Sequence, residues 1–168
     1  MSAGIVMTFD TVSDTRIRQL WSALETPGLI VPNLGRPHLT LALIDEADLG
    51  AAGDALADLA AGMHGTTIAV DSIGLFPGEQ PVLFLNPVAS GVLLALHRRV
   101  HAALRNVGIV TDGPGHNYVP GRWVPHVTLG RAIDAAALDP AIRIANRFRL
   151  RFEVTGIALM AVRTELQL

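Results

Sequence analysis

The sequence predicts an α/β or α+β fold in a single domain over residues 1–168, and three observations carry this prediction. The length of 168 residues suits one domain. Half of the residues are apolar and only 17% are charged, which supplies a sizeable core and excludes a disordered chain. Segments with the two-residue period of strands are interspersed with segments of helical period, and no change of composition marks a linker between domains.

The first half of the chain contains both kinds of pattern. Ile5, Val6 and Phe9 favour an initial strand, and Thr11 or Ser13 is expected to cap the helix that follows. The predicted elements are a strand over 4–10, a helix ending near 25, a loop rich in proline and glycine over 27–37, a strand over 38–44 and a helix over 48–63.

The second half continues the mixture, which gives roughly three helices in all besides a possible short one. Ser90 is expected to cap a helix, and Gly156 is expected to separate the last two strands. The predicted elements are strands over 66–76 and 82–88, a helix over 90–106, an irregular loop over 111–121, a strand over 126–130, a short helix near 134–138, and strands over 147–154 and 157–162.

A short pattern, Pro-His-apolar-Thr-Leu, occurs twice, over residues 37–41 and 125–129. Each copy begins a predicted strand after a loop that contains proline. Alternate residues of a strand share a face, so His38 projects with Thr40 and His126 projects with Thr128. If the two strands lie near each other, two imidazoles and two hydroxyls meet at one site.

This set of side chains suits phosphoryl chemistry. Imidazole is the side chain best fitted to act as an acid or base near neutral pH. Threonine hydroxyls are compact donors for the non-bridging oxygens of a phosphate. One histidine on each side of a phosphodiester suffices for an in-line displacement without a metal, because one takes a proton from the attacking oxygen and the other gives a proton to the leaving oxygen.

Two other interpretations compete with this one. A single His-x-Thr in a strand is usually structural, but two matched copies favour a shared functional site. Two histidines on two strands are also typical of a zinc site, which needs at least one further ligand. The chain has no cysteine, and no acidic residue accompanies both copies of the pattern. We therefore expect no metal and no cofactor.

Composition narrows the chemistry further. The absence of cysteine excludes thiol catalysis, and the absence of lysine excludes a lysine Schiff base and a nucleotide-loaded lysine. All thirteen basic residues are arginine, and ten of them lie in residues 85–168 together with only five acidic residues. A basic second half favours an anionic ligand. The chain has no signal-peptide or membrane-spanning pattern, so we expect a soluble, cytoplasmic protein with no membrane partner.

The doubled His-x-Thr-x motif resembles that of the 2H phosphoesterases, and within them the bacterial 2'-5' RNA ligase and RNA 2',3'-cyclic phosphodiesterase branch. The segments 74–76 and 82–85 look like the paired strands of this family, and the helix ending at Gly108 and Arg131 after the second motif are similar too. The final strand over 157–162 departs from the family pattern, because it lacks the serine and the aromatic residues often found there.

The resemblance implies a fold of two pseudo-symmetric lobes, each a small and mainly antiparallel sheet with outer helices, around a central groove that bears both motifs. It implies a metal-independent reaction that opens a 2',3'-cyclic phosphate of an RNA end or nucleotide to a 2'-phosphomonoester, with 2'-5' RNA ligation as the reverse reaction. We expect His126 to act as general base and His38 as general acid, with Thr40 and Thr128 holding the phosphate oxygens. The opposite assignment of the two histidines stays open. A monomer is expected.

Other residues are weighed as substrate contacts. Arg131 and Arg36 are candidates for neutralising the phosphate, although a solvated arginine is an alternative for both. Tyr118, Trp123 and Phe76 are candidates for stacking on a base, with core packing as the alternative for Phe76 and Tyr118. His97 and His101 are four residues apart on a predicted helix, which is compatible with a metal site but is better interpreted as a polar helix face.

Two further functions stay open beside the phosphoesterase acting on RNA ends. One keeps the chemistry and changes the substrate to a small molecule such as an ADP-ribose cyclic phosphate. The other is an RNA-binding module without turnover, although binding alone does not need both histidines.

Overall fold

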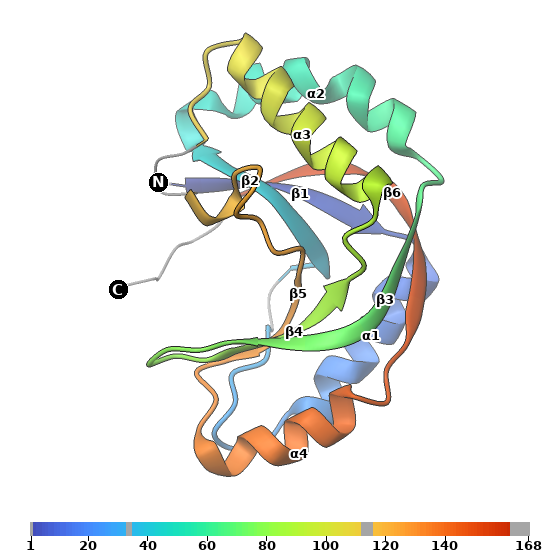
Figure 1. Ribbon diagram of the computed structural model, residues 1–168, viewed down its shortest axis with the longest axis vertical. Coiled ribbons are helices and arrows are strands. Elements are labelled where there is room, and N and C mark those ends of the chain that lie inside the picture. Colours follow the sequence, from blue (N-terminus) through green and yellow to red (C-terminus); the bar gives the residue numbers. More distant parts are fainter. Residues whose placement is uncertain (1, 33–34, 112–115, 162–168) are drawn as a thin grey trace.

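A computed structural model of the protein describes residues 2–32, 35–111 and 116–161. Six antiparallel strands form one sheet in the order β2-β1-β6-β3-β4-β5, with helices at both ends of the molecule (Figure 1). The elements are β1 (Ser2–Phe9), α1 (Thr11–Leu24), β2 (His38–Asp45), η1 (Glu46–Asp48), α2 (Leu49–Met63), β3 (Thr67–Phe76), β4 (Val82–Pro87), α3 (Gly91–Asn106), η2 (His116–Tyr118), β5 (Val127–Arg131), α4 (Ala135–Ala145) and β6 (Leu150–Ala161).

The α+β class predicted from the sequence is confirmed, and two helix starts show why local patterns succeed or fail. Ser90 caps α3 as expected, because its hydroxyl accepts a hydrogen bond from the backbone N–H of Leu93. Helix α1 is capped by Asp10 and not by Thr11 or Ser13: the Asp10 carboxylate accepts the backbone N–H of Ser13 at 2.9 Å. The cap therefore lies one residue before Thr11, the earlier of the two expected positions.

The last strand differs most from the prediction. The sequence predicts that Gly156 separates two strands, but β6 runs unbroken through it. Its residues 150–153 pair with β3, and its residues 154–161 pair with β1. Thr155 is an extra residue in the pairing with β1, at the point where β6 changes its partner. Such a bulge alters the local twist without ending the strand. The strand predicted over 147–154 also begins too early, because Arg147 and Arg149 precede β6.

Helices cover both ends of the sheet. Helices α2 and α3 pack on each other and on β6 and β2, whereas α1 and α4 pack on each other and α1 contacts β5 and β6 (Figure 1). Helix α4 extends to Ala145, well past the expected end near 138, and contains Pro140. The predicted division into two symmetric lobes stays a prediction. Strand β6 pairs with both β1 and β3, so all six strands belong to one sheet. No helix in the described part of the chain is long and apolar enough to cross a membrane.

Candidate active site

The two motifs lie on the two edge strands of the sheet. His38 is the first residue of β2, and His126 immediately precedes β5. Although these strands are at opposite ends of the strand order, the sheet curves so that β2 and β5 contact each other. Figure 1 shows the curve of the sheet, with α2 and α3 at one end of it and α4 at the other. The structure thus brings together the two motifs that the sequence separates by 88 positions.

The two histidines are held in the same way. The Nδ1 atom of His38 lies 2.8 Å from the carbonyl oxygen of Arg36, and that of His126 lies 2.8 Å from the carbonyl oxygen of Val124. A carbonyl only accepts, so Nδ1 carries the proton in both rings. Nε2 of each ring is then left to exchange a proton with a substrate, which is the arrangement that a general acid or base requires.

A β-bulge follows each motif threonine. On β2, Thr40 pairs with Val6 and Ala42 pairs with Ile5, so Leu41 is the extra residue. On β5, Thr128 pairs with Phe84 and Gly130 pairs with Leu83, so the extra residue is Leu129. Both leucines are fully buried. Bulges re-aim side chains locally, and here each one shifts by one position the faces of the residues that follow the motif leucine.

Each motif threonine also accepts a hydrogen bond from a tryptophan. The indole N–H of Trp21 donates to the carbonyl oxygen of Thr128, and the indole N–H of Trp123 donates to that of Thr40, both at 3.0 Å. Trp21 lies on α1, which follows β1, and Trp123 lies just before β5. Each tryptophan therefore supplies the donor that satisfies a backbone carbonyl of a motif strand.

His126 lies among aromatic rings. Its ring centroid is 5.0 Å from that of Phe76, 5.5 Å from that of Phe84 and 6.0 Å from that of Tyr118. Burial in this environment lowers the pKa of His126 below its ordinary value of 6.5, and the charge of His38 lowers it further. His126 is consequently neutral near pH 7, the state in which Nε2 can accept a proton.

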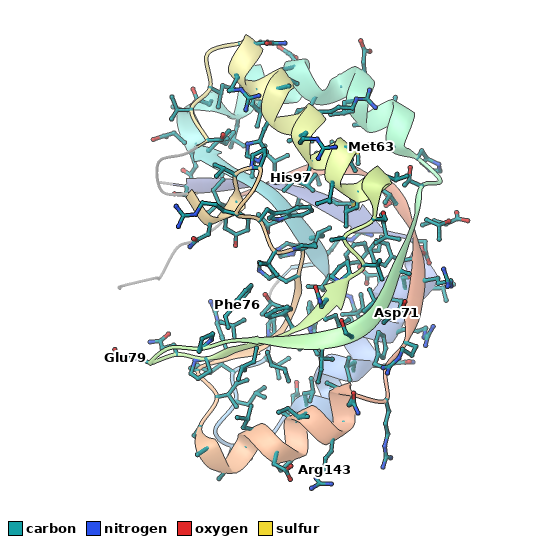
Figure 2. All side chains as sticks on the ribbon, viewed as in Figure 1. Met63, Asp71, Phe76, Glu79, His97 and Arg143 are labelled. Atoms are coloured by element: carbon teal, nitrogen blue, oxygen red, sulfur yellow. The ribbon has the colours of Figure 1, made fainter. Side chains whose placement is uncertain are left out.

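The Phe84 ring reaches His126 because residue 74 is a glycine. Gly74 lies opposite Phe84 in the β3–β4 pair, and a Cβ atom at position 74 would overlap the phenyl ring. The pairing of 74–76 with 82–84 confirms the two strands expected between the motifs. Figure 2 shows Phe76, the partner of Val82, projecting from β3 toward the inner side of the molecule.

Register places Arg131 on the same face as Thr128. Val82 and Phe84 are two residues apart on β4 and lie opposite Arg131 and Thr128, respectively. Residues opposite each other share a face, as do residues two apart, so Arg131 and Thr128 share one face of the sheet. In a regular strand, the third residue after Thr128 would point to the opposite face of the sheet. The bulge at Leu129 turns the exposed Arg131 toward the side that bears the motif.

Arg36 has a partner within the protein. Its Nε lies 3.5 Å from Oδ2 of Asp14, and the side chain remains 58% exposed. Asp14 is mostly buried and also binds Arg18 at 2.6 Å, while Arg18 donates to the carbonyl oxygen of Gly35. These contacts tie α1 to the segment that leads into His38.

The structure also places the three aromatic candidates. Phe76 and Tyr118 are half-buried beside His126. Trp123 differs from the expectation of stacking on a base. It is 9% exposed, and its ring is stacked on His97 with centroids 3.9 Å apart and an angle of 2°. One face of the indole is thus occupied within the protein.

His97 and His101 correct a second expectation. The sequence predicts a polar helix face at these positions, but both side chains are buried. Their burial is not predictable from the sequence, because the groups that bind these histidines lie far away along the chain. Without those partners, two histidines four residues apart have the pattern of an exposed helix face. Trp21 is recognisable from sequence only as a core residue, and no local signal marks its contact with Thr128. Among residues 2–32, 35–111 and 116–161, no three His, Asp or Glu side chains come together in a group that could hold a metal ion.

Comparison with known proteins identifies the family and the fold of the chain. The family model described as the 2'-5' RNA ligase superfamily matches residues 9–165. Among solved structures, the protein TT0787 of Thermus thermophilus superposes with a TM-score of 0.67 at 22% identity, over 99% of this chain and 90% of that one. The MHV ns2 PDE domain gives a TM-score of 0.60 at 19% identity, over 96% of this chain and 100% of that one.

A third structure, described as a phosphoesterase, gives a TM-score of 0.60 at 16% identity, over 94% of this chain and 86% of that one. At these identities the structural likeness establishes a shared fold. No curated protein matches the chain.

Proposed function

Because the chain belongs to the 2'-5' RNA ligase superfamily of 2H phosphoesterases, we propose that it opens 2',3'-cyclic phosphates to 2'-phosphomonoesters. The substrate is an RNA end or a nucleotide. The observation that carries this proposal is the matched pair of imidazoles, each with Nδ1 bound to a backbone carbonyl and Nε2 left for proton transfer.

The reaction needs one base and one acid, and the surroundings of the two histidines support an assignment. Neutral His126 accepts a proton from water at Nε2 as the water oxygen attacks phosphorus. The bond between phosphorus and the ribose 3' oxygen breaks, and His38 donates the proton from its Nε2 to that oxygen. The product keeps its phosphate on the 2' oxygen. The carbonyl of Arg36 accepts the Nδ1 proton of His38 in either charge state, so this hydrogen bond persists through the cycle.

The remaining motif residues bind the phosphate. The hydroxyls of Thr40 and Thr128 donate to its non-bridging oxygens, and Arg131 supplies a positive charge from the same face as Thr128. Arg36 is a second candidate for an outer phosphate contact, through the part of its side chain that stays exposed. Because these donors supply the charge stabilisation, the proposed reaction requires no metal.

The base or ribose lies next to the aromatic residues. Phe76 and Tyr118 are half-buried at the edge of the His126 environment, where a base can stack on an exposed ring face. When a ribose 5' hydroxyl replaces water as the nucleophile, the same step opens the cyclic phosphate to a 2'-5' phosphodiester, which is 2'-5' ligation, and the two histidines keep their roles. They exchange roles in the reverse of this step, in which the 3' hydroxyl attacks phosphorus and the 5' oxygen leaves.

The test is a panel of substrates with product regiochemistry determined. We expect turnover of 2',3'-cyclic AMP and of an oligoribonucleotide with a 2',3'-cyclic phosphate end, with a 2'-phosphate as the product and no change on addition of EDTA. A preference for an ADP-ribose cyclic phosphate over both would assign a small-molecule substrate. Binding of the oligonucleotide with no cleavage of any phosphate ester would contradict the proposal and indicate a binding module.

A further inference from the structure

The separation of the two motif histidines depends on side-chain contacts. No ladder of backbone hydrogen bonds joins β2 to β5, since the described strands place them at opposite ends of the sheet. The hydrogen bond from Trp123 to the carbonyl of Thr40 crosses between them directly. What fixes Trp123 therefore also fixes how His126, three residues later, lies relative to Thr40.

Trp123 is fixed by His97. The imidazole of His97 lies parallel to the indole at 3.9 Å, and its Nε2 lies 2.7 Å from the carbonyl oxygen of Tyr118. One side chain of α3 thus holds two points of the segment that leads into His126. Figure 2 shows His97 between α3 and this segment.

His101, one turn further along α3, holds the other motif. Its Nε2 lies 3.1 Å from the carbonyl oxygen of Leu41, and its Nδ1 lies 2.9 Å from the hydroxyl of Thr111. Leu41 is the bulge residue that follows Thr40. The carbonyls of Thr40 and Leu41 face outward from an edge strand, so Trp123 and His101 supply the donors that a neighbouring strand would otherwise supply.

The hydrogen-bond partners define the protonation of both rings. Backbone carbonyls only accept, so Nε2 carries a proton in His97 and in His101, and Nδ1 of His101 accepts the Thr111 hydroxyl proton. The two Nε2 atoms lie 3.2 Å apart, but each N–H is directed at its own carbonyl. The pair is therefore arranged as two donors to the backbone and not as metal ligands. Burial keeps both rings neutral near pH 7 by lowering the pKa of His101 and lowering that of His97 to about 4.

From these contacts we propose that His97 and His101 are positioning residues that hold the His126 segment and the Thr40 strand at the separation required by the two-histidine reaction. The proposal rests on the proposed function, since only an in-line displacement demands that both imidazoles flank one phosphorus atom. Neither residue touches the substrate. Misplacement of a reacting group by about 1 Å can lower a rate by about 100-fold, so such residues have a measurable effect on turnover.

Three substitutions at position 97 separate the two contacts. His97→Phe keeps an aromatic ring against Trp123 and loses the donor to Tyr118. His97→Gln keeps a donor and loses the stack. His97→Ala loses both. His64→Gln is the matched control, because His64 is exposed at the end of α2. Thr111→Val is a nearly isosteric variant that removes the hydroxyl bound to His101 without disturbing packing.

Steady-state kinetics on 2',3'-cyclic AMP give the first readout, at a temperature well below the unfolding midpoint of each variant. We expect His97→Ala to lower kcat about 10- to 100-fold with KM changed less than about threefold, because the phosphate donors remain in place. His97→Phe should recover most of the loss, and Thr111→Val should lower kcat by about threefold. His64→Gln should equal the wild type.

The second readout does not depend on turnover. Long-range ¹H–¹⁵N NMR spectra follow the titration of the His126 imidazole directly. In His97→Ala, and less in Thr111→Val, we expect its midpoint to move up toward 6.5, because a displaced His126 segment is less buried. His97→Phe should return the midpoint toward the wild-type value.

The outcomes separate the two proposals. If the wild type cleaves no cyclic phosphate but the His126 midpoint moves as described, the proposed function fails and the positioning role stands. If the wild type is active, and folded His97→Ala and Thr111→Val keep both kcat and the midpoint, the positioning role is overturned. A loss of thermal stability with unchanged kcat overturns it as well. Should no His97 variant fold, Thr111→Val alone decides between these results.

Discussion

The two motif strands of this protein share a local geometry, but they differ in the side chains that surround them and in how the preceding segments are anchored. On β2 and on β5, the histidine Nδ1 binds the carbonyl two residues earlier at 2.8 Å, a bulge follows the threonine, and a tryptophan indole binds the threonine carbonyl at 3.0 Å. These are the features that orient an imidazole and a hydroxyl. Both motif strands therefore carry an imidazole and a hydroxyl in matching positions.

The surroundings of the two strands are unlike. His126 packs against three aromatic rings, whereas no aromatic contact involves His38 among the described residues. The position three residues after the threonine is Arg131 on β5 and Leu43 on β2, and both positions share the face of their threonine. In the proposed reaction, the repeated motif supplies the reacting groups, and this difference in the residues outside it is what assigns their roles.

The segments that precede the histidines are also anchored by different means. The segment before His38 is tied to α1 by the ion pair of Arg36 with Asp14 and by the hydrogen bond from Arg18 to the carbonyl oxygen of Gly35, and both arginine side chains are about half exposed. The segment before His126 is tied to α3 by the buried stack of Trp123 on His97. Exposed ion pairs contribute little and weaken with salt, whereas buried stacking does not. The segment before His126 is accordingly the more firmly held of the two.

The largest expected effect comes from removing either reactive nitrogen. In His38→Asn and His126→Asn, the amide can keep the donor to the local carbonyl but has no group at the Nε2 position. We expect each variant to lower kcat on 2',3'-cyclic AMP by about 10²- to 10⁴-fold, because general acid and base catalysis each contribute about that much. The double variant should be little worse than either single one, since the two groups act as a unit.

The pH dependence of the same variants shows which histidine does what. A general base gives the acid limb of the profile and a general acid gives the alkaline limb. The residual activity of His126→Asn should lack the acid limb, and that of His38→Asn should lack the alkaline limb. The reverse pattern would exchange the roles, and a single variant with more than about a tenth of wild-type kcat would contradict a two-histidine mechanism. His64→Asn is the matched control at an exposed position.

A smaller effect is expected at the positions three residues after the threonines. Arg131→Gln removes the positive charge on the face of Thr128, and a charge-assisted hydrogen bond contributes about 1.5–3 kcal/mol. We expect KM for the cyclic nucleotide to rise about tenfold or more. Leu43→Gln makes the corresponding change on β2 and should leave KM within about twofold. Equal effects at both positions would show that the two halves bind the phosphate alike, and no effect at Arg131 would remove it from the site.

Much of the reactive centre is predictable from sequence, because alternation along a strand is a local property. The shared faces of His38 with Thr40 and of His126 with Thr128 follow from a spacing of two. The face of Arg131 is not predictable in this way, since it depends on a bulge that exists only in the pairing of β5 with β4. A residue three positions on would otherwise face the core.

Other features depend on partners distant in the chain. His97 and His101 resemble surface residues in the sequence because the carbonyls that satisfy them belong to Tyr118 and Leu41, 21 and 60 residues away. Gly156 resembles a strand breaker because glycine favours turns, but β6 passes through it while exchanging one neighbour for another. Tertiary contacts override local propensity at both places.

The smallest expected effect tests whether the aromatic environment makes His126 the base. Phe76→Ala removes the nearest ring and exposes the imidazole, so the charged form becomes less costly and the pKa of His126 rises toward 6.5. The acid limb of kcat/KM should then move to higher pH by about half a unit, which is about a threefold loss of rate on the acid side and no loss at pH 8. Leu75→Ala on the opposite face of β3 is the control and should move nothing. Since kcat/KM reports the free enzyme, weaker stacking of the base changes its height and not the position of the limb. A limb that stays in place would therefore mean that the rings serve the substrate alone, and the assignment of His126 as base would lose its physical cause.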